Sequence, residues 1–576
     1  MRFRRVILRR LYRESLSRVN FERSLDCSQH LEHLEGWNDS GDRWVQLLRE
    51  FRMPQKPRRK AMNRRKFLSM AATTLGAISM NVDGSAAAVD SAPQPAAPAK
   101  HRRNVLILMS DQHKHSCMGV AGDTTARTPN LDRLAGESVR FTNAYCTNPV
   151  CAPSRASMLT GLYTHNLLGS ILKKTKNDSI PFSFKHKTMA DRFHGAGYMA
   201  SLIGKMHFLD GQTHGFDYKL QFNDWWQYLG PKVHLYEDEV GHPDSGAGLP
   251  QIPGLWREEG DPWKGHRQHD NRLGPVAVGR PSIMEEEDHF ESFVARESIR
   301  FLEDHAPNDE PFFLISSFLK PHEPFMPATR FAEMFQPEQM KLSPTWGKAD
   351  LRQLPQRVRH SIELCPPTPE LGLGRKDPSE ARKRMASYYG NLAQTDDCVG
   401  QVLDALTRLG LDRNTIVVYT SDHGEMLGDL GLWDKFQFYE GSCGVPLMVR
   451  MPGGAPAVCD TPVSLISLSA TLTDLCGVPS PGPSDGKSFA PLVLQPHSRA
   501  ERGPIFAEFS LGNDGAKYMI RDGDYKYTYW IHDTPELYNL RTDPQELRNL
   551  AGQAKYQATV ARLKQKLFAW HQPAEV

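Results

Sequence analysis

Cysteine is scarce and unpatterned in this sequence of 576 residues. There are nine cysteines, none of them in a Cys-x-x-Cys pair, and the odd number leaves at least one thiol unpaired. This disfavours a disulfide-bonded scaffold and a cysteine-rich metal site, although one or two bridges remain open.

The chain also lacks a large net charge. The formal charge is +3, but residues 1–61 carry 15 Lys and Arg against 8 Asp and Glu, so the remainder carries −4. A mildly acidic body argues against nucleic acid as the main partner. Hydrophobic residues at 39% and charged residues at 24% are typical of a globular protein, and the length allows two structural units.

Several well-known sequence motifs are missing as well. The sequence has no P-loop, no Gly-x-Gly-x-x-Gly after its first predicted strand, no Gly-x-Ser-x-Gly turn and no protease-type cysteine–histidine motif. These absences argue against a nucleotide-binding enzyme and against a serine or thiol hydrolase.

The N-terminal segments predict export. We interpret residues 1–61, which are arginine-rich without an apolar pattern, as an over-extended gene start, with an untranslocated basic tail as the alternative. Residues 62–100 combine Arg64-Arg65, a weakly apolar run too short to span a membrane, the small residues 86–88 and a Pro/Ala-rich linker. We therefore expect the twin-arginine translocase to deliver the protein to the periplasm or the exterior.

Four apolar runs, each followed by polar side chains, predict the fold. The runs are 105–109, 200–204, 312–315 and 415–420, and the polar residues after them are Asp111 and Gln112, Lys205 and His207, Lys320, His322 and Glu323, and Asp422 and His423. Continuous apolar runs indicate strands covered on both faces. Because an open parallel sheet binds ligands at the carboxyl ends of its strands, we expect these side chains to share one edge.

Helical patterns separate the runs, at 129–137, 187–195, 285–305 and 386–409. The predicted fold of residues 101–482 is therefore α/β, with a large, mainly parallel sheet flanked by helices. Residues 483–576 instead alternate as short strands around a turn at 521–524 and end in a helical pattern at 556–570, which predicts a smaller antiparallel sheet-plus-helix subdomain.

Two irregular stretches interrupt the main pattern. Residues 219–282 are rich in Gly, Pro, His and Trp, and we interpret them as a lid facing the substrate. Residues 336–380 form a second insertion without a clear pattern. Asp396 and Asp397 resemble metal ligands, but their mid-helix position favours capping or solvation.

Cys151 occupies the position of a nucleophile. It stands two residues before Pro153 in a short apolar segment that closes at Gly161, so we expect it at a helix N-terminus. Free N–H groups there attract an anion, and Arg155 follows one turn later. A buried structural cysteine is the alternative.

The other strand-end residues predict a metal and a cationic pocket. Asp111, Asp422 and the neutral Gln112 offer hard oxygen ligands for Ca²⁺ or Mg²⁺, while His423 makes Zn²⁺ a competitor. Arg155, Lys205 and Lys435 bring positive charge for an anionic group. The histidines His207 and His322 exchange protons near neutral pH.

The segment Cys151-Ala152-Pro153-Ser154-Arg155, with Thr160-Gly161 after it, resembles the signature of type I sulfatases of the alkaline phosphatase-like superfamily. The resemblance covers residues 103–452. It implies that a formylglycine-generating enzyme converts Cys151 to formylglycine (3-oxoalanine), beside a Ca²⁺ ion. It assigns metal binding to Asp111, Gln112, Asp422 and His423, although Gln112 stands where the family has a second acid and His423 where many members have Asn.

The same resemblance implies a mechanism. The aldehyde made from Cys151 hydrates, and one hydroxyl, assisted by Arg155, attacks sulfur while Lys205 and Lys435 stabilise the sulfuryl oxygens. His322 protonates the leaving alcohol, and His207 is the candidate base for the elimination that releases sulfate. Splitting one difficult step into two is the gain of nucleophilic catalysis.

The sequence leaves the substrate open. The predicted reaction is hydrolysis of a sulfate ester, of a sulfated carbohydrate by preference or of choline sulfate. A phosphonate or phosphate ester hydrolase with the same modified residue is the alternative, because the anions are similar in size and shape. A non-catalytic protein that binds sulfated glycans is a further one, and the oligomeric state stays open.

Overall fold

The computed structural model describes residues 102–168, 186–207, 213–233, 281–308, 310–363, 377–480, 482–498, 503–509 and 515–573. All of them belong to a single unit, Ala97–Val576. The predicted gene start, export signal and linker therefore lie outside the described residues, as do residues 234–280 of the predicted lid. Among the described helices, none combines the length and apolar character needed to cross a bilayer.

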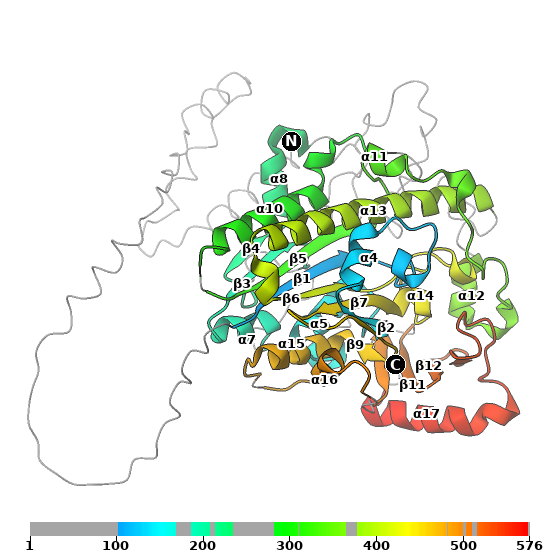
Figure 1. Ribbon diagram of the computed structural model, residues 1–576. Coiled ribbons are helices and arrows are strands. Elements are labelled where there is room, and N and C mark those ends of the chain that lie inside the picture. The colour runs from blue at the N-terminus through cyan, green and yellow to red at the C-terminus, as the bar shows by residue number, and fades with distance from the viewer. Residues whose placement is uncertain are drawn as a thin grey trace, which may run out of the picture. The chain divides into compact units, whose positions relative to one another are not determined.

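A nine-stranded sheet forms the centre of the fold (Figure 1). Its order is β4-β3-β5-β1-β6-β7-β2-β8, with β9 paired to β2. The strands are β1 (Asn104–Asp111), β2 (Val139–Tyr145), β3 (Met199–Gly204), β4 (Tyr218–Leu220), β5 (Phe312–Pro321), β6 (Thr415–Ser421), β7 (Gly444–Arg450), β8 (Ala457–Cys459) and β9 (Val463–Ser464). Only β7 pairs antiparallel with its neighbours, which confirms a mainly parallel sheet.

The central strand β1 shows why its sequence is apolar throughout. Val105, Ile107 and Met109 belong to the hydrophobic core on one face of the sheet, and Leu106 and Leu108 belong to the core on the other face. Since successive side chains of a strand point to opposite faces, a strand covered on both sides needs apolar residues at every position.

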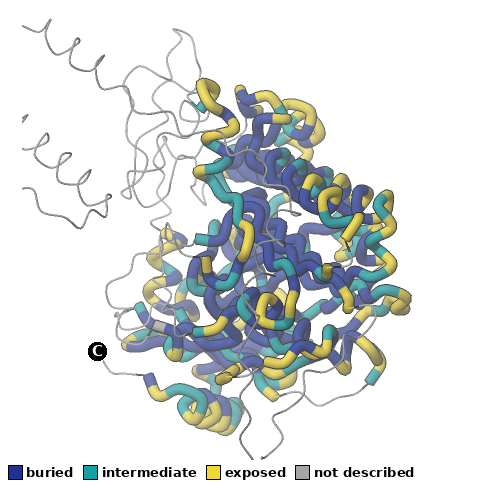
Figure 2. The backbone as a smooth tube through the Cα atoms, turned by 90° about the vertical axis from the view of Figure 1, so that its left-hand side faces the viewer, coloured by how far each residue is buried: buried dark blue, intermediate teal, exposed yellow. Residues whose placement is uncertain are grey.

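Helices cover both faces of this sheet (Figure 1). One layer contains α4, α8, α10 and α13, and the other contains α5, α7, α15 and α16. The bounds are α4 (Pro129–Ala135), α5 (Cys151–Thr160), α6 (Thr164–Leu168), α7 (Met189–Gly195), α8 (Phe222–Leu229), α10 (Phe290–His305), α11 (Thr329–Ala332), α12 (Gln356–Glu363), α13 (Pro378–Arg408), α14 (Glu440–Cys443), α15 (Leu468–Cys476) and α16 (Ala490–Leu494). Buried residues accordingly run through the interior of the backbone trace (Figure 2).

A second sheet of four antiparallel strands follows in the chain, as predicted. It consists of β10 (Ile505–Phe509), β11 (Lys517–Asp522), β12 (Tyr525–Trp530) and β13 (Glu536–Asn539), and α17 (Gln557–Trp570) packs on it. Trp530 and Tyr538 of this sheet share a hydrophobic cluster with Met426, Leu430 and Tyr439. The smaller sheet therefore supports the segment that follows β6.

Two details refine the sequence-based expectations. Trp225, which the lid hypothesis placed near substrate, is 1% exposed and donates its indole N–H to Asp288 O at 2.8 Å, so it is a core residue. Asp396 is a cap for another helix: its carboxylate accepts hydrogen bonds from the backbone N–H groups of Asn130 (3.1 Å) and Leu131 (2.8 Å) at the start of α4.

Candidate active site

The strand ends bring the predicted residues together. Strand β1 pairs with β6 so that Ser110 lies opposite Ser421, which places Asp111 and Asp422 next to each other. On its other side β1 pairs with β5, and the backbone N–H of His322 donates to Asp111 O at 3.1 Å. The carboxyl ends of parallel strands thus form the site, as the sequence predicts.

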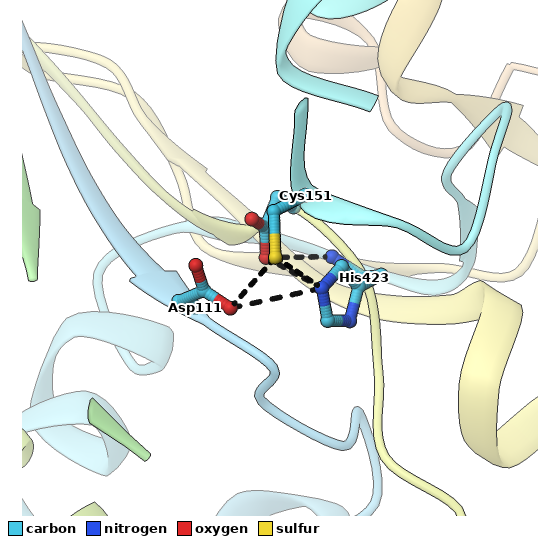
Figure 3. Close-up of side chains that lie close together, drawn as sticks. Asp111, Cys151 and His423 are labelled. Atoms are coloured by element: carbon cyan, nitrogen blue, oxygen red, sulfur yellow. Dashed lines mark hydrogen bonds and ion pairs between the residues drawn. The ribbon is translucent and has the colours of Figure 1, made fainter. Parts of the chain in front are cut away.

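Cys151 is the first residue of α5 and points at these strand ends. Its Sγ lies 3.1 Å from His423 Nε2 and 3.5 Å from Asp111 Oδ1, and Figure 3 shows the three side chains converging. Helix α5 ends at Gly161, whose φ of +77° suits a residue without a Cβ. The thiol, 1% exposed, therefore lies buried at a helix N-terminus, facing polar side chains rather than the hydrophobic core.

Arg155, on the same helix as Cys151, binds both aspartates through its guanidinium group. Its Nε donates to Asp422 Oδ2 at 2.7 Å and its Nη2 to Asp111 Oδ2 at 3.0 Å, and Nη1 contacts Ser317 Oγ and the carbonyl of Lys205. Lys205 adds an ion pair to Asp111 at 2.8 Å. Although burial favours the neutral acid, the nearby cations hold the pKa of Asp111 well below its ordinary value.

Lys435 reaches the centre from the opposite side. Its Nζ lies 2.8 Å from Gln112 Oε1 and 3.4 Å from Cys151 Sγ. Burial opposes its charge, but Cys151, Glu323 and Asp111 raise the pKa of Lys435. The amine therefore stays protonated at neutral pH, where it can stabilise an anion held next to Cys151.

Three histidines of the site have defined surroundings. His423 Nδ1 faces Gly424 O at 2.9 Å; a carbonyl only accepts, so Nδ1 carries the proton and Nε2 presents a lone pair to the centre. His322 Nδ1 likewise faces Glu323 O at 2.7 Å. Burial, with Lys205 and Arg155, holds the pKa of His207 well below its ordinary value, so its imidazole is neutral at pH 7.

The centre has the donor set of a cation site. Asp111, Cys151, Asp422 and His423 each offer one ligand atom, and these atoms lie within 4.8 Å of one another. Two ionised carboxylates and an inward-facing imidazole lone pair fit a divalent cation. Gln112 Oε1 accepts from Lys435 Nζ at 2.8 Å, and the same amine lies 3.4 Å from Cys151 Sγ, so this amide is a candidate for a further oxygen donor. The residues therefore fit the metal that the sequence predicts.

Unusual backbone conformations gather around these side chains. Gln112, His207, Asp434 and Phe436 have φ values of 66°, 61°, 63° and 75°. Such left-handed conformations cost non-glycine residues about 1–2 kcal/mol each and concentrate at functional sites. They mark the residues whose positions the surrounding fold imposes.

Sequence reasoning missed several members of the site. Ser154 Oγ donates to Asp422 O at 2.6 Å, and Ser317 Oγ accepts from Arg155 at 2.9 Å. Glu425 and Glu323 accept hydrogen bonds from the Gln112 amide. Glu323 was among the predicted strand-end residues, whereas Glu425 was missed although it follows the predicted run 415–420 by a few residues; the serines carry no comparable signal.

Two family models match this chain. The model described as Sulfatase matches residues 103–478, and the model described as N-sulphoglucosamine sulphohydrolase, C-terminal, matches residues 428–572. The chain belongs to the sulfatase family. The activity of this sulfatase is therefore hydrolysis of sulfate esters, and the residues predicted for that reaction are those gathered around Cys151.

Individual relatives agree with this assignment. The sulfatase is 31% identical to a choline-sulfatase of Rhizobium meliloti (strain 1021), over 78% of this chain and 82% of the relative. It is 29% identical to an arylsulfatase of Clostridium perfringens, over 81% and 93% of the two chains. A crystal structure of the phosphonate monoester hydrolase of Agrobacterium radiobacter superposes with a TM-score of 0.65 at 24% identity, covering 81% of this chain and 95% of that one. The last likeness supports the alkaline phosphatase-like fold.

Proposed function

We propose that this sulfatase acts through a formylglycine made from Cys151, with one Ca²⁺ ion at the aspartate pair. The observation that carries the proposal is the position of Cys151 Sγ, which lies within 3.5 Å of Asp111, His423 and Lys435 at a helix N-terminus. An aldehyde there supplies, as its hydrate, one hydroxyl for attack on sulfur and a second whose deprotonation expels sulfate.

The neighbouring side chains have separate tasks in this proposal. Arg155 fixes the positions of Asp111 and Asp422 relative to the start of α5. Lys205 and Lys435 stabilise the negative charge of the sulfuryl oxygens. His322 is the proton donor for the leaving alcohol, through the Nε2 atom that does not face Glu323 O. His207, whose imidazole is neutral, accepts the proton in the elimination.

Asp111, Gln112, Asp422 and His423 would hold the cation. Three oxygen donors favour Ca²⁺ over Mg²⁺, because Mg²⁺ prefers small octahedral sites with several waters, while the His423 donor keeps Zn²⁺ as a competitor. When bound, Ca²⁺ withdraws electron density from an oxygen of the sulfate group and so favours attack on sulfur.

For the substrate we propose the sulfate ester of a carbohydrate or of choline. The relative from Rhizobium meliloti, a choline-sulfatase, supports the second of these, and the match to a C-terminal model of N-sulphoglucosamine sulphohydrolase supports the first. The proposal also includes export through the twin-arginine translocase to the periplasm or exterior, after modification by a formylglycine-generating enzyme.

The deciding experiment is the mass of the proteolytic peptide that contains Cys151, from protein made in a host with formylglycine-generating machinery. We expect the aldehyde or its hydrate in place of the thiol, and hydrolysis of 4-nitrophenyl sulfate that Cys151→Ala abolishes. Cys398→Ala is the matched control, because Cys398 is equally buried but lies in α13 away from the site. An intact thiol together with full activity would refute the formylglycine mechanism.

The same preparation tests the alternative substrate. A similar tetrahedral anion would fit the cationic pocket, so kcat/KM is measured for 4-nitrophenyl sulfate and for a 4-nitrophenyl phosphonate monoester. A ratio in favour of the phosphonate would make phosphonate hydrolysis the main activity of the site.

A further inference from the structure

We infer that Glu425 is a positioning residue, which fixes the orientation of the Gln112 side-chain amide so that the amide oxygen faces the reaction centre. The inference rests on the proposed cation site, because it assigns the reason why a neutral Gln can serve at position 112. It concerns a residue that lies outside the set predicted from the sequence.

The contacts of the Gln112 amide allow only one orientation. Its Nε2 donates to Glu425 Oε2 at 2.5 Å and to Glu323 Oε2 at 3.1 Å, so both amide hydrogens are used. Its Oε1 accepts from Lys435 Nζ at 2.8 Å. The Lys435 ammonium only donates, so the amide atom that faces it must be Oε1; a flipped amide would place its NH₂ group against that ammonium. One lone pair of Oε1 remains for a cation.

Glu425 cannot turn away from this amide. It is fully buried, and its other oxygen, Oε1, accepts from the backbone N–H groups of Leu427 at 2.9 Å and Asp434 at 2.8 Å. Asp434 directly precedes Lys435. One carboxylate therefore fixes the Gln112 amide on one side and the backbone that carries Lys435 on the other.

This arrangement also keeps the side chain at position 112 neutral and places the acidic side chains of Glu425 and Glu323 one hydrogen bond further from the proposed cation. An acid at position 112 would place a negative charge directly beside the cation, whereas the Gln112 amide is neutral. Glu425 and Glu323 lie behind the amide and polarise its N–H bonds, which increases the negative charge on Oε1. Gln112, Glu425 and Glu323 thus act as one unit that offers a strong neutral oxygen donor.

The test is the variant Glu425→Gln. Its carbonyl oxygen still accepts from Leu427 and Asp434, so its NH₂ group must face Gln112 and force that amide to flip. Because partners that orient metal ligands typically contribute about 10–100-fold to metal affinity, we expect the Ca²⁺ affinity to fall by about that factor, as measured by calorimetric titration of Ca²⁺ into the full-length, metal-free protein. The matched control is Glu508→Gln, since Glu508 is as fully buried but bonds to His165 away from the site.

Rescue separates positioning from a merely structural role. In the double variant Gln112→Glu/Glu425→Gln, the new carboxylate accepts from the amide at 425 and from Lys435, so part of the lost Ca²⁺ affinity and kcat/KM returns. Recovery is partial because Glu323 then faces the new carboxylate. A Glu425→Gln protein that binds Ca²⁺ as the wild type does, or a double variant no better than the single one, would overturn the inference.

A readout that does not depend on metal keeps this test apart from the proposed function. In crystal structures without metal, Lys435 Nζ should remain within hydrogen-bond distance of residue 112 in the wild type and the double variant and move away in Glu425→Gln. If the lysine stays in all three, the inference is wrong whatever the enzyme binds. If it moves as expected while the wild type binds no Ca²⁺, the positioning role holds and the proposed cation fails.

Discussion

Removing the charge of Arg155 should destabilise the fold far more than removing a surface arginine. In the variant Arg155→Met the aliphatic stem is largely retained, but Asp111 and Asp422 lose the guanidinium that bonds to them at 3.0 and 2.7 Å. Both carboxylates are fully buried, so water cannot replace the lost partner. Breaking a buried ion pair from one side typically costs about 3–5 kcal/mol.

This cost translates into a measurable shift in melting temperature. Unfolding entropy is about 2.1 cal/mol/K per residue, or about 1 kcal/mol/K for the unit Ala97–Val576, so a loss of about 3–5 kcal/mol lowers Tm by about 3–5 °C. Added Ca²⁺ should narrow the difference, since a cation then compensates the two carboxylates.

Thermal unfolding followed by circular dichroism in EDTA, with and without excess Ca²⁺, measures both effects. Arg133→Met is the matched control: Arg133 pairs with Asp404 at 2.7 Å, but its side chain is 48% exposed, and such pairs contribute about 0–1 kcal/mol. If Arg155→Met melted within about 1 °C of the wild type in EDTA, the buried clamp would not carry the stability assigned to it here.

Two further predictions concern parts of the molecule outside the catalytic centre. Asp396→Ala should cost about 1–2 kcal/mol in urea unfolding, because α4 loses its cap, yet leave Ca²⁺ affinity unchanged; weaker binding would mean that Asp396 is a ligand after all. Burial raises the pKa of Glu546 from 4.5 to about 8; the nearby Lys526 lowers it and the nearby Glu440 raises it further. Between pH 4.5 and 8 the folded protein therefore keeps a proton on Glu546 that the unfolded protein has released. The free energy of unfolding should therefore fall by a few kcal/mol relative to Glu546→Gln as pH rises from 5 to 8, and parallel profiles for the two proteins would contradict this.

The main sheet could be predicted because its strands are covered on both faces. Burial on both sides favours consecutive apolar residues, at 105–109 in β1 and 416–419 in β6, and a run of that kind is visible without an alignment. The polar residues after each run then had to share an edge, which placed Asp111 and Asp422 together. Strand β2 was missed because Arg140, Thr142 and Asn143 interrupt its apolar pattern. Strand β7 was missed although residues 445–449 are apolar, because Pro446 within the run argues against a strand inside a sheet.

Local sequence patterns do not reveal which side chains form hydrogen bonds with residues that are far away in the sequence. Gln112 and Glu425 are 313 positions apart, and only the register of the sheet brings them within 2.5 Å. Trp225 was assigned to a lid because its neighbours are polar and irregular, whereas its indole ring fills a gap beside Phe290 in the core. Composition predicted the segment's character but not the direction of this side chain.

The burial of Cys151 limits the time available for its proposed conversion to formylglycine. In the folded protein the thiol is 1% exposed, and it is enclosed by residues encoded much later, the last of them Lys435, which follows 284 positions downstream. Under the proposed formylglycine mechanism, the modifying enzyme has to reach Cys151 while those residues are still being synthesised or before they fold. At about 5–20 residues per second, synthesis of that stretch takes roughly 15–60 s, and this interval is the minimum time during which the Cys151 thiol of a newly made chain is accessible to an enzyme.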